Sequence, residues 1–235
     1  MNGLIVAAGR SSRLYPRTIE LPKCMLKIDG ERLIDRALRL FRENGVEKIY
    51  LVVGFQSDKL VDYLGKQVEY IYNPFYASTN NMASLWMAIP HLGRGELLYS
   101  HSDLIYHPEI LRTAVEQRSQ ADLSLIYDPD SIHQEAMKIQ LSDGKFQQSS
   151  KEIPLAEADG EWTGLSFFSQ NGLESFTEMA RELLLDGQFN AYDTAAFNRL
   201  AEQGAEFQLL QTGGRPWREI DDEVDLAAAR EDFAS

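Results

Sequence analysis

Short apolar runs alternate with amphipathic segments along most of this chain, and this alternation constrains its fold more than any other feature. The runs at residues 4–7, 48–53 and 96–100 have the length and composition of buried strands. Residues 32–41 carry apolar side chains at helical spacing, and Asn44-Gly45 follows them as a stop signal. We therefore predict an α/β fold with a Rossmann-like, mostly parallel central sheet and helices on both faces.

The pattern changes after residue 137, where strand signals come closer together. Residues 137–141, the Asp143-Gly144 turn and the run that starts at Phe146 predict a β-hairpin. We find no internal repeat, low-complexity tract or linker. The sequence therefore predicts a single domain over residues 1–235, with a hairpin and helical excursion at 137–205.

Composition excludes several classes of partner. The 235-residue chain has a formal net charge of −13, which argues against a nucleic-acid partner, because phosphate backbones are held chiefly by Lys and Arg. No apolar run approaches the ~20 residues of a membrane span, so no membrane insertion is expected. A basic leader segment is absent and Cys24 is the single cysteine, which favours the reducing cytoplasm as its location. The composition leaves open whether the chain is a monomer or a homodimer.

The loop after the first strand has the residues of a polyphosphate grip. It combines small residues with Arg13, and Lys23 follows on the same loop system behind Pro22. Small residues let backbone N–H groups approach a ligand closely, and a guanidinium offers a planar fork of donors to phosphate. The loop has neither the three glycines of G-x-G-x-x-G nor the Gly-Lys-Ser/Thr of a P-loop, so an NAD-dependent oxidoreductase is disfavoured. The sequence predicts a nucleotide-binding site of another kind.

Two motifs carry a resemblance to a known family. Ala-Ala-Gly-Arg-Ser-Ser-Arg at residues 7–13 and Leu-Pro-Lys at 21–23 resemble the signature of the nucleotidyltransferases that activate sugar phosphates and phosphocholine. Asn-Pro-Phe-Tyr at 73–76 and Thr-Asn-Asn-Met-Ala-Ser-Leu-Trp at 79–86 are similar to the branch of CTP-dependent cytidylyltransferases that act on phosphocholine and 2-aminoethylphosphonate. The resemblance runs from Leu4 to about Leu226 and departs from many members at Ser11 or Ser12, where they have a glycine. It implies a nucleotidyltransferase fold.

The resemblance also implies a reaction. CMP would pass from CTP to a small amino-alcohol phosphate or phosphonate, with release of pyrophosphate, by in-line attack on the α-phosphorus with Mg²⁺ as cofactor. Arg13 and Lys23 match the family's triphosphate-binding Arg and the Lys that stabilises the α-phosphate. Asp103 and Asp221 match its two metal-binding aspartates, and Glu219 is expected to assist, because period two places Glu219 and Asp221 on one side of a strand.

Loops at the carboxyl ends of parallel strands meet in one crevice, so we expect the ligand contacts there. The residues expected to bind the nucleotide are Ala7, Ala8, Gly9, Arg10, Ser11, Ser12, Asn73, Asn81, Ser84 and Ser102. Those expected on the acceptor side, which residues 137–205 mostly form, are Lys151, Trp162, Tyr192 and Asp193. The four histidines show no metal-ligand spacing, so no zinc site is predicted.

Two alternatives stay open from the sequence. One is a sugar-1-phosphate nucleotidyltransferase that uses UTP or dTTP, against which the Asn-Asn-Met segment at 80–82 and the short length speak. The other is a non-catalytic nucleotide-binding regulatory protein, against which the joint presence of Arg13, Lys23, Asp103 and Asp221 speaks. The sequence does not distinguish phosphocholine from aminoethylphosphonate as the acceptor.

Overall fold

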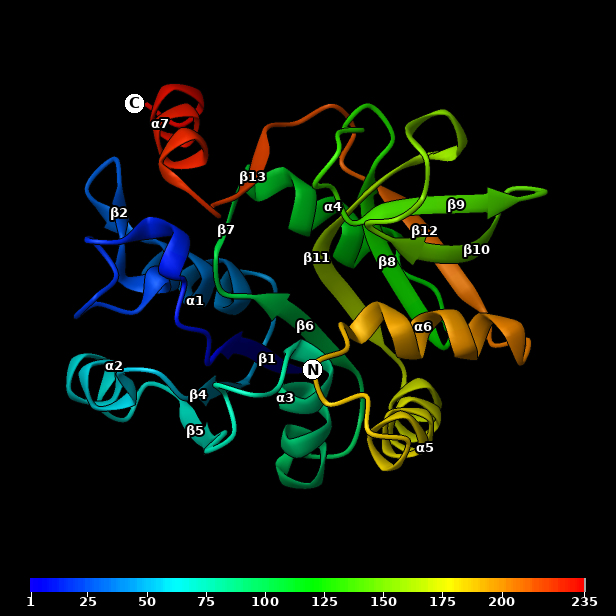
Figure 1. The fold of residues 1–235 in the computed structure, drawn as a ribbon, viewed down its shortest axis with the longest axis horizontal. Coiled ribbons are helices and arrows are strands. Elements are labelled where there is room, and N and C mark those ends of the chain that lie inside the picture. The colour runs from blue at the N-terminus through cyan, green and yellow to red at the C-terminus, as the bar shows by residue number, and fades with distance from the viewer. Residues whose placement is uncertain (235) are drawn as a thin grey trace.

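A nine-stranded sheet runs through the molecule and has β1 in its interior (Figure 1). The computed structural model describes residues 1–234. The strands follow the order β10-β9-β11-β6-β1-β4-β5, and β8 and β12 extend the sheet beside β11. The strands of this sheet are β1 (Asn2–Ala7), β4 (Lys48–Val53), β5 (Glu69–Tyr72), β6 (Leu97–His101), β8 (Leu123–Asp128), β9 (Lys138–Ser142), β10 (Lys145–Ser150), β11 (Gly160–Phe168) and β12 (Phe207–Gln211).

The half of the sheet around β1 is parallel, as the sequence predicts. Strand β1 pairs with β4 on one side and with β6 on the other, and β4 pairs with β5, all in parallel register. Strands β1, β4 and β6 are buried along most of their length, which explains their largely apolar sequences, whereas the edge strand β5 buries only Ile71. The loops after β1, β4 and β6 therefore leave the sheet at the same edge.

The other half of the sheet is organised by β11, which runs antiparallel to its neighbours β6, β8 and β9. All nine residues of β11 are buried. The hairpin of β9 and β10 is present as predicted, and its turn has Asp143 and Gly144 at positive φ. Strand β12 adds in parallel to β8 at the far side.

Helices cover both faces of the sheet, and each face has its own apolar cluster. Helices α1, α2 and α4 pack on one face, and α3, α5 and α6 pack on the other (Figure 1). Helix α1 begins one residue and ends two residues after the predicted range 32–41, because the apolar spacing and the Asn44-Gly45 stop mark it clearly. The helices are α1 (Leu33–Glu43), α2 (Ser57–Leu64), α3 (Asn81–Ala88), α4 (Pro108–Gln117), α5 (Gln170–Leu185), α6 (Asp193–Glu202) and α7 (Glu223–Asp232).

Two small sheets that the sequence did not predict as separate units lie beside the main one. One pairs β2 (Lys27–Ile28) with β3 (Glu31–Arg32), and the other pairs β7 (Leu104–Tyr106) with β13 (Trp217–Glu219). The second pairing brings the C-terminal segment next to the end of β6. Among residues 1–234, none of the helices has the length and apolar character needed to cross a bilayer.

Candidate active site

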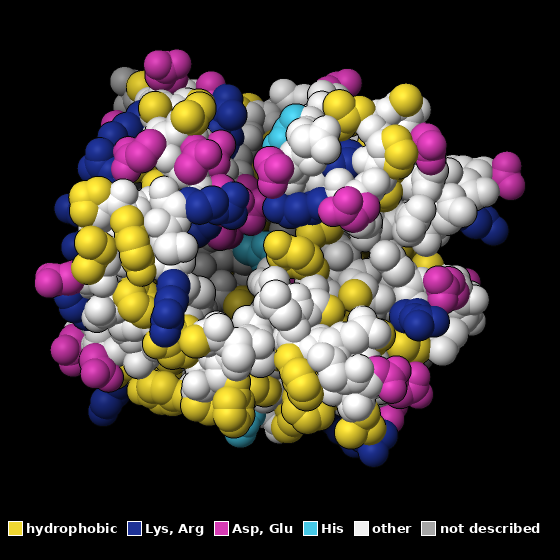
Figure 2. All heavy atoms as spheres, viewed as in Figure 1, with side chains coloured by type: hydrophobic (Ala, Val, Ile, Leu, Met, Phe, Trp, Pro, Cys, Tyr) yellow, Lys and Arg dark blue, Asp and Glu magenta, His cyan; other side chains and the backbone are white. Residues whose placement is uncertain are grey.

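A cavity of about 270 Å³ opens where β1 and β6 end. From β1 the chain passes through α1 to β4, which lies on one side of β1 in the sheet. Strand β6 lies on the other side of β1, so the strand order reverses at β1. Ligands of open α/β sheets bind at such a point, beyond the carboxyl ends of the strands. Figure 2 shows the hollow in the middle of this face, with Lys, Arg, Asp and Glu side chains at its rim and a histidine deep inside.

The loop after β1 forms one wall, and local hydrogen bonds hold its backbone. The amide of Phe55 donates to the carbonyl of Ala8 at 3.0 Å, and the Thr18 hydroxyl donates to the carbonyl of Ser11 at 2.7 Å. Ser11 has φ 52° and ψ 47°, the left-handed conformation that glycine adopts most easily. Ser11 therefore occupies a backbone position at which glycine would be the least strained residue. A Cβ placed on Gly9 would meet no heavy atom of residues 1–234 within 4 Å, so the loop faces open space there.

Four charged side chains from opposite ends of the chain meet in this cavity. Lys23 Nζ lies 2.6 Å from Asp103 Oδ2 and 2.9 Å from Asp221 Oδ1, and its side chain is only 10% exposed. Arg13 reaches Asp221 Oδ2 at 2.7 Å from the more exposed side. The ammonium thus bridges two carboxylates that lie 118 residues apart in the sequence, since one is at position 103 and the other at 221.

The charges perturb one another as their geometry requires. Burial lowers the pKa of Lys23, but the Asp103 and Asp221 carboxylates outweigh burial and raise that pKa above its ordinary value. Burial likewise raises the pKa of Asp221, but Lys23 and then Arg13 outweigh it, so the net pKa of this carboxyl is lowered. Both groups are therefore charged at neutral pH, and the cluster is a preformed ionic site.

A second polar network lies behind the charge cluster. His101 Nε2 lies 3.1 Å from Asp193 Oδ2 and 2.9 Å from Asn81 Nδ2, and its Nδ1 lies 4.0 Å from Glu219 Oε1. The Tyr99 hydroxyl donates to the same Asp193 oxygen at 2.7 Å. Burial lowers the pKa of His101, but the hydrogen bond to Asp193 and the Glu219 carboxylate outweigh it and raise the pKa to about 10.

The donor set suits a hard divalent cation. Asp103 Oδ1 is buried and has no hydrogen-bond partner among residues 1–234, although Oδ2 of the same carboxylate binds Lys23. An unpartnered buried carboxylate oxygen is costly unless a ligand satisfies it. Glu219 and Asp221 present further carboxylate oxygens to the same cavity. Oxygen ligands of this kind are those that Mg²⁺ takes from proteins, so the residues present fit the ion.

Lys151, Trp162 and Tyr192, which the sequence analysis expects on the acceptor side, all line the cavity. Lys151 Nζ lies 5.8 Å from the centre of the Tyr192 ring. Trp162 is buried and its indole N–H donates to the carbonyl of Leu165, so it contributes a wall and not a hydrogen bond. A neighbouring cavity of about 230 Å³ shares Arg13, Glu219 and Asp221 with the first one, and four further acidic residues line it: Glu135, Glu161, Asp222 and Asp225.

Most of the residues that the sequence singled out line the first cavity. They are Ala7, Ala8, Gly9, Ser11, Arg13, Lys23, Asn81, Ser102, Asp103, Lys151, Trp162, Tyr192, Glu219 and Asp221. They come from the end of β1 and its loop, the start of α3, the end of β6, the residue after β10, β11, the N-cap of α6 and the segment around β13. The structure thus brings both ends of the chain to one place.

Asn73 and Ser84 were expected to bind nucleotide, but they lie outside the cavity lining. Asn73 is 1% exposed and donates to Ser84 Oγ at 3.0 Å and to Thr79 Oγ1 at 3.1 Å. Its Oδ1 accepts from the Phe75 amide at 2.9 Å. These polar groups fix the loop between β5 and α3, so a contact of Asn73 or Ser84 with nucleotide would have to compete with this internal pairing and stays a prediction.

Three other expected contacts also lie outside the lining. Asp193 is fully buried and accepts from Tyr99, so it supports His101 and does not face an acceptor. Arg10 is exposed, and its guanidinium carbon lies 5.5 Å from the centre of the Tyr76 ring. Ser12 is exposed and starts a short 3₁₀ turn that ends at Leu14.

Some residues of the lining were not among the sequence candidates, and His101 is the most important of them. Its partner Asp193 lies 92 residues away, so no local spacing reveals the pair. One weak signal existed, because His101 and Asp103 are two residues apart at the end of a strand. Asn80, Met137 and Gly164 also line the cavity, and Asn80 caps α3 by accepting from the Asn81 amide.

Comparison with known proteins gives consistent results. The model of the MobA-like NTP transferase domain matches residues 3–182. A CTP:phosphoglutamine cytidylyltransferase from Campylobacter jejuni is 26% identical over 250 residues, which cover 96% of this chain and 98% of that protein. The bifunctional protein GlmU from Methanococcus vannielii is 29% identical over 92% of this chain, but the match spans only 53% of that longer protein. The solved structure of CTP:phosphocholine cytidylyltransferase from Streptococcus pneumoniae superposes with a TM-score of 0.78 over 98% of this chain and 97% of that one, at 21% identity.

Proposed function

Because the chain belongs to the family of MobA-like NTP transferase domains, we propose that this nucleotidyltransferase moves CMP from CTP to a small amine-bearing phosphate or phosphonate. The observation that carries the proposal is the position of Lys23 between Asp103 and Asp221, with Arg13 beside them at the end of β1. This arrangement supplies the charges that a triphosphate and a divalent cation need. Relatives with cytidylyltransferase names support the choice of CTP.

The reaction follows from the chemistry of the groups. An oxygen of the acceptor phosphate attacks the α-phosphorus of CTP, the bond to the bridging oxygen breaks, and pyrophosphate leaves. The attacking phosphate is already an anion, so the site needs no strong general base. Its task is to hold and neutralise the phosphates, since positioning and electrostatics carry the rate of such transfers.

Each residue has a part in that task. The backbone of the β1 loop and Arg13 bind the triphosphate, because both offer donors at the mouth of the cavity. Lys23 stabilises the charge that develops on the α-phosphate, and it is already held at this depth by the two aspartates. Asp103, Asp221 and Glu219 would hold Mg²⁺, which when bound would neutralise phosphate charge and favour the departure of pyrophosphate.

The acceptor side favours a substrate with both an anionic and a cationic end. Lys151 and Arg13 are available to a phosphate or phosphonate group. The acidic neighbouring cavity, with the half-exposed Glu219 at its border, suits an amine or a quaternary ammonium. We assign most of this side to residues 137–205, which supply Lys151 and Tyr192.

A substrate panel tests the proposal. The four nucleoside triphosphates are each combined with phosphocholine, phosphoethanolamine, 2-aminoethylphosphonate, phosphorylated glutamine and a set of sugar 1-phosphates, and pyrophosphate is measured. We expect release from CTP with at least one amine-bearing acceptor, and loss of release when EDTA is added. Pyrophosphate from UTP or dTTP with a sugar 1-phosphate, and none from CTP, would contradict the proposal.

The same panel covers the second candidate, a sugar-1-phosphate nucleotidyltransferase. The similarity to GlmU over 92% of this chain favours that candidate. The acidic second cavity speaks against it, because a neutral sugar gains little from several carboxylates. Nucleotide binding without turnover for every pair would instead indicate a regulatory protein.

A further inference from the structure

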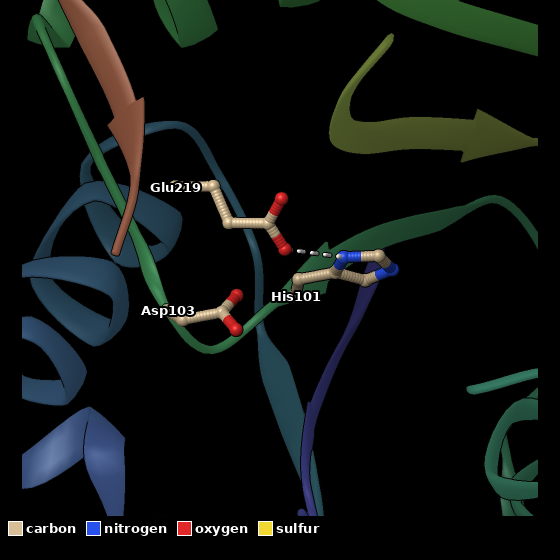
Figure 3. A group of neighbouring side chains, drawn as sticks. All are labelled: His101, Asp103 and Glu219. Carbon is tan, nitrogen blue, oxygen red and sulfur yellow. Dashed lines mark ion pairs between the residues drawn. The ribbon is translucent and has the colours of Figure 1, made fainter. Parts of the chain in front are cut away.

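Three side chains from two strands converge at the inner end of the cavity. His101 ends β6, Asp103 lies two residues further on, and Glu219 ends β13, which the β7 pairing brings alongside. One ligand atom from each of the three lies within 4.8 Å of the others. Figure 3 shows the Glu219 carboxylate directed at the imidazole edge and the Asp103 carboxylate below both.

We propose that His101, Asp103 and Glu219 form a binding site for a first-row transition dication, such as Mn²⁺, Co²⁺ or Zn²⁺, and that the imidazole nitrogen makes the site prefer these ions to Mg²⁺. Mg²⁺ takes oxygen ligands and gains little from imidazole, whereas Mn²⁺, Co²⁺ and Zn²⁺ accept both nitrogen and oxygen ligands. The site shares Asp103 and Glu219 with the Mg²⁺ site proposed above, so the inference rests on the proposed function where it names the ion used in CMP transfer, whereas binding of the ion can be measured without turnover.

The first argument is the orientation of the imidazole. Asp193 is fully buried and a carboxylate only accepts hydrogen bonds, so the 3.1 Å contact requires a proton on His101 Nε2, and the Asn81 amide nitrogen, 2.9 Å from the same atom, then cannot donate to it. Asp193 is itself held, because its Oδ2 accepts from Tyr99 and its Oδ1 accepts from the Thr194 amide at 3.0 Å. A carboxylate that holds one ring nitrogen while the other faces an ion is the usual support of a metal-ligating histidine.

The second argument is the position of Nδ1, which faces Glu219 and would exchange its proton for the ion. Gly164 lies against it, and a Cβ at this position would come within 3.0 Å of Nδ1 and 3.2 Å of Cγ of the ring. Gly164 has φ +83°, so both the space and the backbone favour glycine. Nδ1 faces Glu219 Oε1 at 4.0 Å, a separation that leaves room for an ion to bind both atoms after a small shift.

The third argument concerns competition with Lys23. The ammonium occupies Asp103 Oδ2 and Asp221 Oδ1, but Asp103 Oδ1 stays buried and without a hydrogen-bond partner among residues 1–234. A cation bound to Oδ1 satisfies this atom while Lys23 keeps the other oxygen. The site therefore does not require the ionic bridge to break.

The test measures metal binding directly on the full chain, stripped with EDTA and without nucleotide. Co²⁺ is titrated by its visible absorption and Mn²⁺ by its electron paramagnetic resonance signal, and Mg²⁺ is added as a competitor. We expect one site that binds Co²⁺ and Mn²⁺ at least about tenfold more tightly than Mg²⁺. The Co²⁺ spectrum should show a nitrogen ligand.

Three variants locate the site, and circular dichroism checks that each is folded. His101→Asn should abolish the preference over Mg²⁺, and His91→Asn, an exposed histidine outside the cavity, should keep it. Asp193→Asn should weaken Co²⁺ binding by about 10- to 100-fold, because it removes the support of the imidazole. If His101→Asn does not fold, Glu219→Gln at the 40% exposed position gives the same test, with weaker Co²⁺ binding expected.

Equal affinity of the unaltered protein for Mg²⁺ and Mn²⁺ would overturn the proposal, as would an unchanged preference in folded His101→Asn or unchanged Co²⁺ binding in Glu219→Gln. These measurements involve no turnover. Their failure is therefore separate from failure of the pyrophosphate panel, which tests the proposed function.

Discussion

Lys23→Met removes the ammonium that bridges the two aspartates and keeps most of the side-chain volume. The lysine side chain is 10% exposed and makes contacts of 2.6 Å and 2.9 Å to Asp103 and Asp221. Loss of one preorganised donor to a developing anion typically lowers kcat by about 10²- to 10³-fold, which corresponds to about 2.7–4 kcal/mol. We expect a loss of turnover in this range.

The same substitution changes stability in a pH-dependent way. Removal of one partner from a buried charged pair costs about 3–5 kcal/mol. Arg13 stays 2.7 Å from Asp221, so we expect a loss at the lower end of this range, about 3 kcal/mol at pH 7. The pKa of Asp221 is lowered in the folded protein, so its contribution is present above the unfolded pKa of about 4 and is lost as the pH falls through the folded pKa. The difference between the two proteins should therefore shrink below about pH 4.

The assays are pyrophosphate release from CTP and urea unfolding at pH 7 and below pH 4. Lys59→Met, at an exposed position on α2, is the matched control. It should change the free energy of unfolding by no more than about 0.5 kcal/mol and should leave the rate of pyrophosphate release unchanged. A Lys23→Met protein that turns over within a few-fold of the unaltered chain would refute the role of the ammonium. A stability loss that grows toward low pH would refute the ionic account of the bridge.

Three further outcomes follow from the geometry. Asn73→Ala should lower the free energy of unfolding by about 1–3 kcal/mol, because its three hydrogen bonds are lost, and an accompanying tenfold rise in KM for CTP would show that it does contact nucleotide. Gly54→Ala should lower the free energy of unfolding by about 1–3 kcal/mol, because the Cβ of the alanine would lie 2.7 Å from Tyr76 Cβ and 2.8 Å from the Ala8 carbonyl oxygen. An unchanged Tm of this variant would contradict the prediction. Burial and the nearby Asp103 raise the pKa of Cys24 to about 12. A thiol reagent at pH 8 should therefore label Cys24 at least about 100-fold more slowly in the folded protein than in urea, and rapid labelling of the folded protein would contradict this prediction.

The parts of the fold that local pattern determines could be predicted from the sequence. The β4 run is apolar along its length, and the structure has it at Lys48–Val53, the residues predicted. The cap at Asn80 and the stop at Asn44 mark helix ends through hydrogen bonds between near neighbours. Strand β7 was not predicted, because its three residues become a strand only by pairing with β13, more than 100 residues later.

The charged part of the site could be anticipated, whereas its supporting network could not. Lys23 lies on the loop system after β1 and Asp103 follows β6, so their convergence follows from the topology of the main sheet. Asp221 follows β13 in a separate small sheet, and only the family resemblance placed it at the site. Asp193 was expected on the acceptor side as the acid next to Tyr192, because an aromatic face and an acidic residue together can hold a quaternary ammonium. Contacts with Tyr99 and His101, which no spacing rule reveals, bury it completely instead.

The central claim is that Lys23, Arg13, Asp103 and Asp221 form one site for transfer of a nucleoside monophosphate. It is tested most directly by supplying CTP labelled with ³²P at either the α or the γ position, together with an amine-bearing phosphate acceptor. The α label should appear in a product joined to the acceptor and the γ label only in pyrophosphate. Transfer of the γ label to the acceptor, or no labelled product with any acceptor, would contradict the claim.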